Sequence, residues 1–124
     1  MKFKNNSPIY MQIADELCRR ILAGEYAEEE KMPSVRETAV EMEVNVNTVT
    51  RAFEWLQQNQ VVQVARGMGN FVALGAKEKI SGLQRDEFFH GYLPDLFRRM
   101  QLLDISMERV VEEYGHFKEA SEND

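Results

Sequence analysis

Five polar side chains crowd residues 45–51, and their chemistry suits the edges of DNA bases. The stretch reads VNVNTVTRAF from residue 44 to residue 53. An asparagine amide can pair with adenine, and an arginine guanidinium can donate two hydrogen bonds to guanine. Capping a helix accounts for one asparagine, but folding does not require the other polar side chains at these positions. The five residues are Asn45, Asn47, Thr48, Thr50 and Arg51.

A helix must present these side chains, and the spacing of apolar residues predicts one that begins after Asn45. At roughly 100° per residue, the apolar positions fall on one side of this helix. They are Val49, Ala52, Phe53 and Leu56. The opposite side then carries Asn47, Thr50, Arg51 and Glu54. We therefore expect the polar cluster to face outward.

Two further helices are predicted before this one. Ser7 is expected to cap a helix whose first residue is Pro8, and the helix should run to about Ala23, with Gly24 in a left-handed conformation after it. Ser34 and Glu37 have the spacing of a reciprocal capping box, which indicates a helix of two to three turns ending near Glu43.

Beyond Asn59 the pattern changes from helical to alternating. The runs VVQVA and NFVAL flank a turn that contains Arg66 and Gly67, which predicts a β-hairpin. Three helices followed by a hairpin match a winged helix-turn-helix, in which the second helix of the pair enters the DNA major groove. The expected fold is thus mostly α with a small β-hairpin, and the DNA-binding domain covers residues 1–75.

Residues 76–124 are expected to form a short helical segment for dimerisation, which is also where an unidentified small-molecule effector could bind. Apolar residues recur there at helical spacing, Pro94 marks a kink or the start of a new helix, and Ser106 should cap the last helix. Too little chain is present to bury both apolar stripes internally, so we expect a homodimer. The stripes comprise Phe89, Leu93, Leu96, Phe97, Met100, Leu103, Val110, Val111, Tyr114 and Phe117.

The net charge of the chain is −6, which at first argues against a nucleic-acid partner. Residues 1–75 account for only −2 of this charge, and residues 76–124 carry −4. The sequence contains one cysteine, Cys18, and we find neither an apolar run that could span a membrane nor a leader peptide. We expect a cytoplasmic protein with no membrane association.

Catalytic and metal-binding patterns are lacking in the sequence. His90 and His116 are far apart, and a single cysteine gives no spacing for zinc ligands. No nucleophile and base, glycine-rich phosphate loop or pair of carboxylates stands at a recognisable spacing. We therefore expect no enzyme activity, no metal and no cofactor.

Several ordered blocks in residues 7–74 resemble the DNA-binding domain of GntR-type bacterial transcription regulators. These blocks are PIYMQIADELCRRILAGEY, MPSVRETAVEMEVNVNTVTRAFEWLQQNQVV and RGMGNFV. The NxNTVxRA pattern and the short helical tail are similar to the YtrA subfamily, whose small C-terminal part serves mainly in dimerisation. The resemblance implies DNA contacts from Ser34, Arg36, Asn45, Asn47, Thr48, Thr50, Arg51, Arg66 and Gly67.

The chain departs from the family at two places. Val46 stands where much of the family has an arginine, and Glu28, Glu29 and Glu30 stand where it commonly has a Pro-Gly turn. The function predicted is a sequence-specific transcription regulator, with repression as the expected direction, that binds double-stranded DNA at an inverted-repeat (palindromic) operator as a dimer. The alternative is a winged-helix module for protein contacts, which the acidic charge favours.

Overall fold

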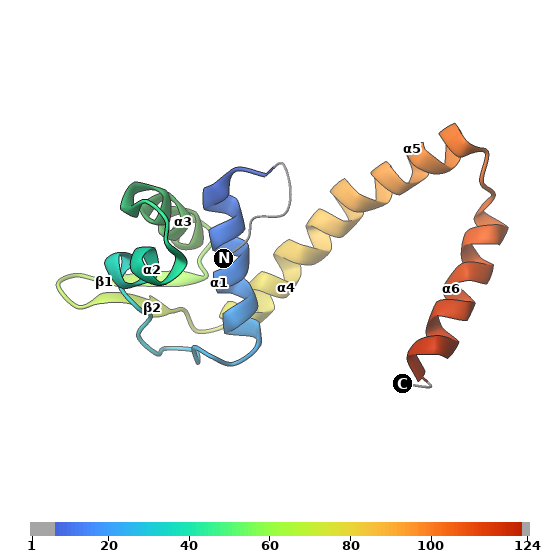
Figure 1. Ribbon diagram of the computed structural model, residues 1–124. Coiled ribbons are helices and arrows are strands. Elements are labelled where there is room, and N and C mark those ends of the chain that lie inside the picture. Colours follow the sequence, from blue (N-terminus) through green and yellow to red (C-terminus); the bar gives the residue numbers. More distant parts are fainter. Residues whose placement is uncertain (1–6, 123–124) are drawn as a thin grey trace. The chain divides into compact units, whose positions relative to one another are not determined.

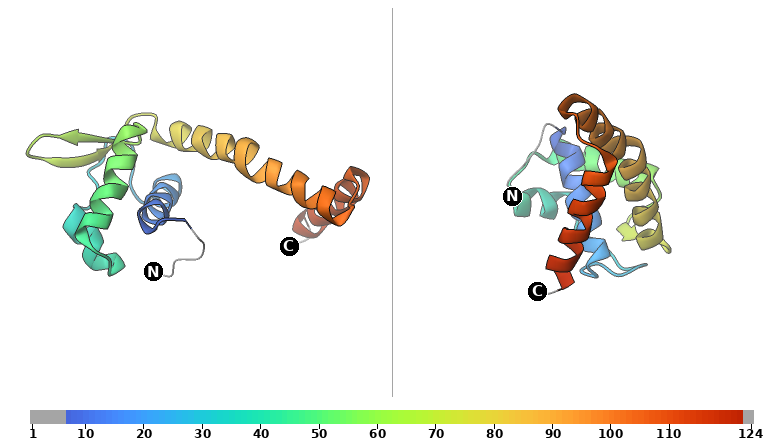
Figure 2. Two further views of the ribbon diagram at one scale, coloured as in Figure 1. Left: turned by 90° about the horizontal axis from the view of Figure 1, so that it is seen from above. Right: turned by 90° about the vertical axis from the view of Figure 1, so that its right-hand side faces the viewer.

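The computed structural model describes residues 7–122, and its first part is a three-helix core with a β-hairpin (Figure 1). The helices are α1 (Ile9–Leu22), α2 (Val35–Met42) and α3 (Val46–Gln58). Strands β1 (Val62–Ala65) and β2 (Gly69–Val72) pair antiparallel, with Val62 opposite Val72 and Ala65 opposite Gly69. The left view of Figure 2 shows the hairpin projecting beyond α3. This arrangement confirms the predicted winged helix-turn-helix.

The core of this part lies between the apolar faces of α1 and α3. Ile13, Leu17 and Ile21 of α1 are at most 1% exposed, and the residues of the predicted stripe of α3 are at most 2% exposed. That stripe is Val49, Ala52, Phe53 and Leu56. Helical spacing of apolar residues thus identified the faces that pack together.

The ends of α1 follow the local sequence with one shift. Pro8 occupies the capping position, where Ser7 was expected, and its carbonyl oxygen accepts from the N–H groups of Met11 and Gln12. Because Pro has no N–H and a fixed φ, it suits this end of a helix. Gly24 has φ +86°, and this left-handed residue follows the last turn as predicted.

The turn between α2 and α3 is short, and a capping residue lies at each of its edges. Glu43, a non-glycine residue with φ +56°, is the C-cap of α2, and Asn45 is the N-cap of α3. Only Glu43, Val44 and Asn45 separate the two helices. The helix-turn-helix geometry is therefore defined by local backbone conformation as well as by the core.

An ion-pair network joins α1 to α2. The Arg20 guanidinium is 2.7 Å from a Glu41 carboxylate oxygen and 3.0 Å from one of Glu16, and it donates to the Tyr26 hydroxyl. Arg19 also pairs with Glu16 at 2.8 Å. These hydrogen bonds, the one from Arg19 first, lower the pKa of Glu16 to about 2. Glu16 therefore stays ionised wherever the protein is near neutral pH.

The acidic loop after α1 is held against the hairpin. Glu29 adopts φ +69°, and its N–H donates to the carbonyl oxygen of Val72. Lys31 then forms an isolated antiparallel bridge with Phe71 of β2. The loop without the family's Pro-Gly turn is thus closed by main-chain hydrogen bonds to the wing.

The chain divides into two compact units at Leu83, and each is described separately. Helix α4 (Ala76–Glu87) begins in the first unit, where Ala76 and Ile80 are buried in the core and Leu83 packs against it. The first compact unit thus extends eight residues beyond the expected division at residue 75. A winged-helix fragment that ended at Leu74 would lose these core side chains.

The second unit contains the end of α4, a π-helical turn η1 (Phe88–Tyr92), α5 (Leu93–Leu103) and α6 (Met107–Glu122). Pro94 lies in the first turn of α5, which is one of its two predicted positions. Ser106 caps α6 as predicted, since its hydroxyl oxygen accepts from the Arg109 N–H. None of the described helices is both long and apolar enough to cross a membrane.

Candidate nucleic-acid interface

Asn45 caps the start of α3. The side-chain oxygen of Asn45 accepts from the N–H of Asn47 at 2.7 Å. This bond satisfies one of the donors left free at a helix N-terminus. It leaves the two amide hydrogens of Asn45 directed at no partner among the described residues, and the residue is exposed. Asn45 can therefore cap the helix and donate outward at once.

The outward face of α3 carries the other predicted polar residues. Asn47 is exposed, whereas Thr48 and Thr50 are half-buried. The Thr50 hydroxyl donates to the Val46 carbonyl oxygen at 3.0 Å, so its remaining role toward a ligand is as an acceptor. Within residues 7–122, no side-chain hydrogen bond engages the Asn47 amide, which is free to donate and accept.

Arg51 is placed by an aromatic residue that the sequence analysis did not select. Its guanidinium carbon lies 4.2 Å from the centre of the Tyr10 ring on α1. This is a cation–π contact, which uses the face of the guanidinium and leaves its N–H edges available. Tyr10 is half-buried against the core and lies outside the apolar stripe of α1. The sequence gave no sign that Tyr10, which follows the apolar residue Ile9, contacts Arg51.

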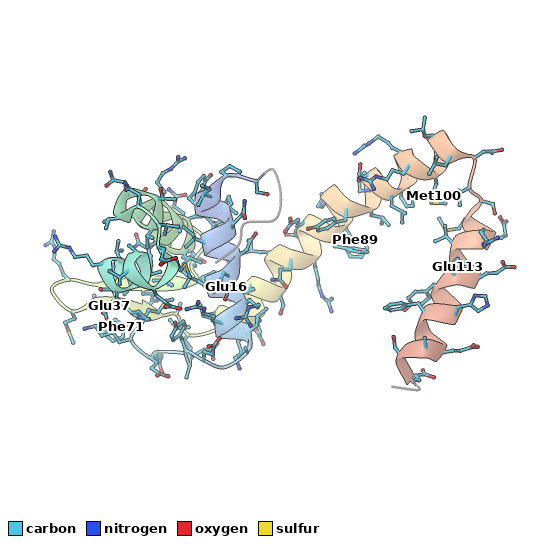
Figure 3. All side chains as sticks on the ribbon, viewed as in Figure 1. Glu16, Glu37, Phe71, Phe89, Met100 and Glu113 are labelled. Carbon is cyan, nitrogen blue, oxygen red and sulfur yellow. The ribbon has the colours of Figure 1, made fainter. Side chains whose placement is uncertain are left out.

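The N-terminus of α2 combines the predicted capping box with an exposed arginine. Ser34 Oγ accepts from the Glu37 N–H at 3.0 Å, and the Ser34 N–H donates to the Glu37 carboxylate at 3.1 Å. The backbone bond from Ser34 is the main cause of a lowered pKa at Glu37. Arg36 is exposed beside this end. Figure 3 shows Glu37 on α2.

The first two residues of α2, Val35 and Arg36, precede the first intrahelical donor of the helix. Their N–H groups therefore suit an anion at the positive end of the helix dipole. The Glu37 carboxylate lies in the same turn and reduces this attraction. A phosphate at this end would gain most from the flexible Arg36 side chain.

The tip of the wing is a tight turn from Ala65 to Gly69. Gly67 has φ +76°, a conformation that glycine adopts without strain, and the Met68 N–H donates to the Ala65 carbonyl oxygen. Arg66 is exposed, as is Met68 at 63%. The turn thus presents Arg66 and a bare main chain at Gly67.

Two contacts support the wing from the helix-turn-helix side. The Gln57 side-chain amide of α3 donates to the Asn70 side-chain oxygen of β2 at 2.9 Å. The Lys31 side chain lies beside Gly69 at the start of the same strand. A Cβ atom added to Gly69 would be 3.1 Å from Lys31 Cε. Lys31 is exposed and adds a positive charge beside the wing, which the sequence analysis did not assign. A lone lysine after three glutamates was the only available signal.

The predicted dimerisation residues lie in the second unit and are mostly exposed. Leu93 and Val110 are partly covered, and Met100 is only 8% exposed, so it contributes little free apolar surface. The others range from 40% to 68% exposed, and they are Phe89, Leu96, Phe97, Leu103, Val111, Tyr114 and Phe117. Helix α6 diverges from α5 in Figure 1, consistent with these exposures.

The described part of the chain offers no cluster of three or more His, Cys, Asp or Glu side chains that could hold a metal ion. Cys18 is buried in the core, and burial raises the pKa of its thiol to about 12. A thiol in this state is a poor nucleophile. The chemistry that the first unit presents is hydrogen bonding and positive charge on α2, α3 and the wing.

Comparison with known proteins matches this geometry to a family of regulators. The family model described as "Bacterial regulatory proteins, gntR family" matches residues 9–72. The HTH-type transcriptional regulator YhcF of Bacillus subtilis, whose name marks it as uncharacterized, is 32% identical over 118 residues, which is 95% of this chain and 96% of that protein. The HTH-type transcriptional repressor YtrA of B. subtilis is 34% identical over 74 residues, 60% of this chain and 57% of that protein.

Solved structures give the same result. A crystal structure from Bacteroides thetaiotaomicron, titled as a transcriptional regulator of the GntR family, has a TM-score of 0.80 and 42% identity, and the match covers 92% of this chain and 99% of that one. The DNA-binding domain of AraR, solved in complex with operator ORR3, has a TM-score of 0.53 and 25% identity over 59% of this chain and 88% of that one. These relatives are regulators, which agrees with the expectation that this chain is not an enzyme.

Proposed function

Because this chain belongs to the gntR family of bacterial regulatory proteins, we propose that it is a YtrA-like repressor that binds an inverted-repeat operator as a homodimer. The observation that carries the sequence-specific part is the start of α3. There, Asn45, Asn47 and Arg51 keep hydrogen-bonding groups that the fold does not use. Protein interfaces rely more on aromatic residues and Met at their centre, so this face favours DNA over a protein partner.

The residues of α3 divide into two roles in this proposal. Asn47 and Arg51 read base edges in the major groove, with adenine and guanine as their best partners. Asn45 donates its free amide hydrogens, Thr48 offers its hydroxyl group to a base or to the adjacent phosphate, and Thr50 can accept from a donor on a base edge. Tyr10 holds Arg51 in place from behind.

The remaining predicted residues bind the backbone. Arg36 and Ser34 hold a phosphate near the N-terminus of α2, and Arg66 with the main chain at Gly67 follows the duplex from the wing. Such contacts fix the register of the protein but read no sequence. Lys31, beside the wing, adds to the same electrostatic attraction.

The second unit supplies the dimer. A single winged helix contacts only a few base pairs, and joining two on one duplex raises the effective concentration of each. The exposed apolar residues of α5 and α6, among them Phe97 and Tyr114, give a second copy a surface to cover. A two-fold dimer requires an inverted-repeat operator with matching half-site spacing.

The direction of regulation is proposed from the relative whose name states it, the repressor YtrA. A repressor of this kind would act in the cytoplasm, where its operator is. An effector would bind in the α4–α6 segment, and its chemistry is left open. DNA binding itself requires no cofactor in this proposal.

Selection of duplexes from a random library, followed by titration at two salt concentrations, tests the proposal. We expect a palindromic sequence to be enriched and to bind at least a hundredfold more tightly than a scrambled duplex. Equal affinity for both duplexes would exclude sequence-specific binding and would favour the alternative function, a winged-helix module for protein contacts.

The dimer is tested in the full chain with Tyr114→Lys and the control His116→Lys. The two residues lie on opposite faces of α6, both are exposed, and each variant introduces a lysine. We expect sedimentation to show dissociation for Tyr114→Lys alone, together with a loss of affinity for the full palindrome. A dimer that both substitutions leave intact contradicts the assignment of this face.

A further inference from the structure

Val46, the first residue of α3, is an apolar side chain that the core does not use. Its side chain is 43% exposed, and it stands between two exposed polar residues, Asn45 and Asn47. The core face of α3 is complete without it, since its four buried positions begin at Val49. Packing of the core therefore does not explain why a valine occupies this exposed position among polar residues.

The surroundings of Val46 hold it in a defined position. Its carbonyl oxygen accepts from the Thr50 hydroxyl at 3.0 Å, one turn further along the helix. The bond from the Asn47 N–H to Asn45 fixes the residues on either side. A valine in a helix also has one strongly preferred rotamer. The two methyl groups thus form a small, preordered apolar surface between hydrogen-bonding side chains.

Resting on the proposed DNA-binding function, we infer that Val46 reads the 5-methyl group of a thymine in the major groove. The thymine methyl is the one apolar group that distinguishes base pairs on that side of the duplex, and an apolar side chain is its natural contact. Valine can neither donate to guanine nor accept from cytosine. A G·C pair at this place would leave base groups without partners, so the preference is for a thymine at one fixed position in each half-site.

The test replaces each thymine of a selected operator half-site, one at a time, with deoxyuridine. This change removes the methyl group and leaves every hydrogen-bonding group of the base intact. Loss of one buried methyl contact corresponds to about a fourfold weaker affinity. We expect one thymine to show this loss with the native chain and to show none with Val46→Ala.

Val40→Ala is the matched control. Val40 is 79% exposed on α2, and the change removes the same two methyl groups outside α3. We expect this variant to keep both the native affinity and the native sensitivity to deoxyuridine. Thermal unfolding of both variants should match the native protein, so that a change in binding reports the contact.

Each outcome decides the inference. If no thymine responds to deoxyuridine, or if the response persists in Val46→Ala, Val46 does not read a methyl group although the protein still recognises its operator. If the library yields no preferred sequence at all, the proposed function fails first, and the inference fails with it.

Discussion

Removing the Tyr10 ring should weaken recognition of the operator through Arg51. The guanidinium of Arg51 lies 4.2 Å from the ring centre, well within the range of a cation–π contact. In Tyr10→Ala the long Arg51 side chain loses this support and samples several rotamers in the free protein. Binding to a base must then order it again, which reduces the affinity.

The size of this effect is limited by the strength of the contact. Ordering a side chain of this kind costs about 0.5–1.5 kcal/mol on binding. The free energy by which the Tyr10 ring orders Arg51 cannot exceed the free energy of the cation–π contact, which is about 0.5–1 kcal/mol at an exposed site. Tyr10→Ala should therefore bind each half-site about two- to fivefold more weakly. Arg51→Ala, which removes the proposed base contact, should cost about 1–3 kcal/mol.

Fluorescence anisotropy with the selected operator and a scrambled duplex measures both effects. Tyr10→Phe keeps the ring and should behave as the native chain. In the Arg51→Ala background, Tyr10→Ala should have no further effect on affinity, although it lowers thermal stability because Tyr10 also packs against the core. Tighter operator binding by Tyr10→Ala would show that the stack holds Arg51 away from DNA and would refute the reasoning.

Three further predictions concern the interface and the fold. Asn47→Ala should weaken binding to the selected operator by about 1–3 kcal/mol and leave binding to the scrambled duplex nearly unchanged. Equal losses of affinity for both duplexes would contradict base reading by Asn47. Arg36→Ala and Arg66→Ala should weaken both duplexes alike and reduce the slope of log affinity against log salt by about one unit, and an unchanged slope would exclude a phosphate contact.

Glu16→Gln should lower the free energy of unfolding near neutral pH by about 1–2 kcal/mol, a value reduced for solvent screening of the exposed Arg19. The folded-state pKa of Glu16 is depressed to about 2, so its contribution is full above its ordinary value of 4.5 and is lost as pH falls toward 2. Denaturant titrations over that pH range should show a shallower pH dependence for the variant, and identical curves would contradict this assignment.

Local signals in the sequence predicted most of the helix-turn-helix. The capping box at Ser34 and the Asn45 cap depend on residues at most three positions apart, so both could be identified from spacing alone. The buried face of α3 followed from its apolar period for the same reason. The hairpin followed from alternation and from the glycines that its turn requires.

The features that the sequence did not reveal depend on contacts between distant residues. Tyr10 meets Arg51 across two helices, and Lys31 joins β2 across some forty residues. Periodicity shows which side of a helix is apolar but not what covers it. Ala76 and Ile80 were therefore assigned to the tail, although they pack into the winged-helix core. The π-helical turn at residues 88–92 lacks a sequence signature of its own.

The acidic charge of the chain is compatible with DNA binding because the arginines of the proposed interface are not held in ion pairs. Arg19 and Arg20 are paired with Glu16, Glu25 and Glu41 on α1, α2 and the loop between them. By contrast, none of the ion pairs in the described chain engages the three arginines of the proposed interface, Arg36, Arg51 and Arg66. A phosphate would therefore meet guanidinium groups that no ion pair of the described chain engages. With so few of them, electrostatics alone gives weak binding, and the proposed base contacts and the proposed pairing of two copies on one duplex would supply the rest.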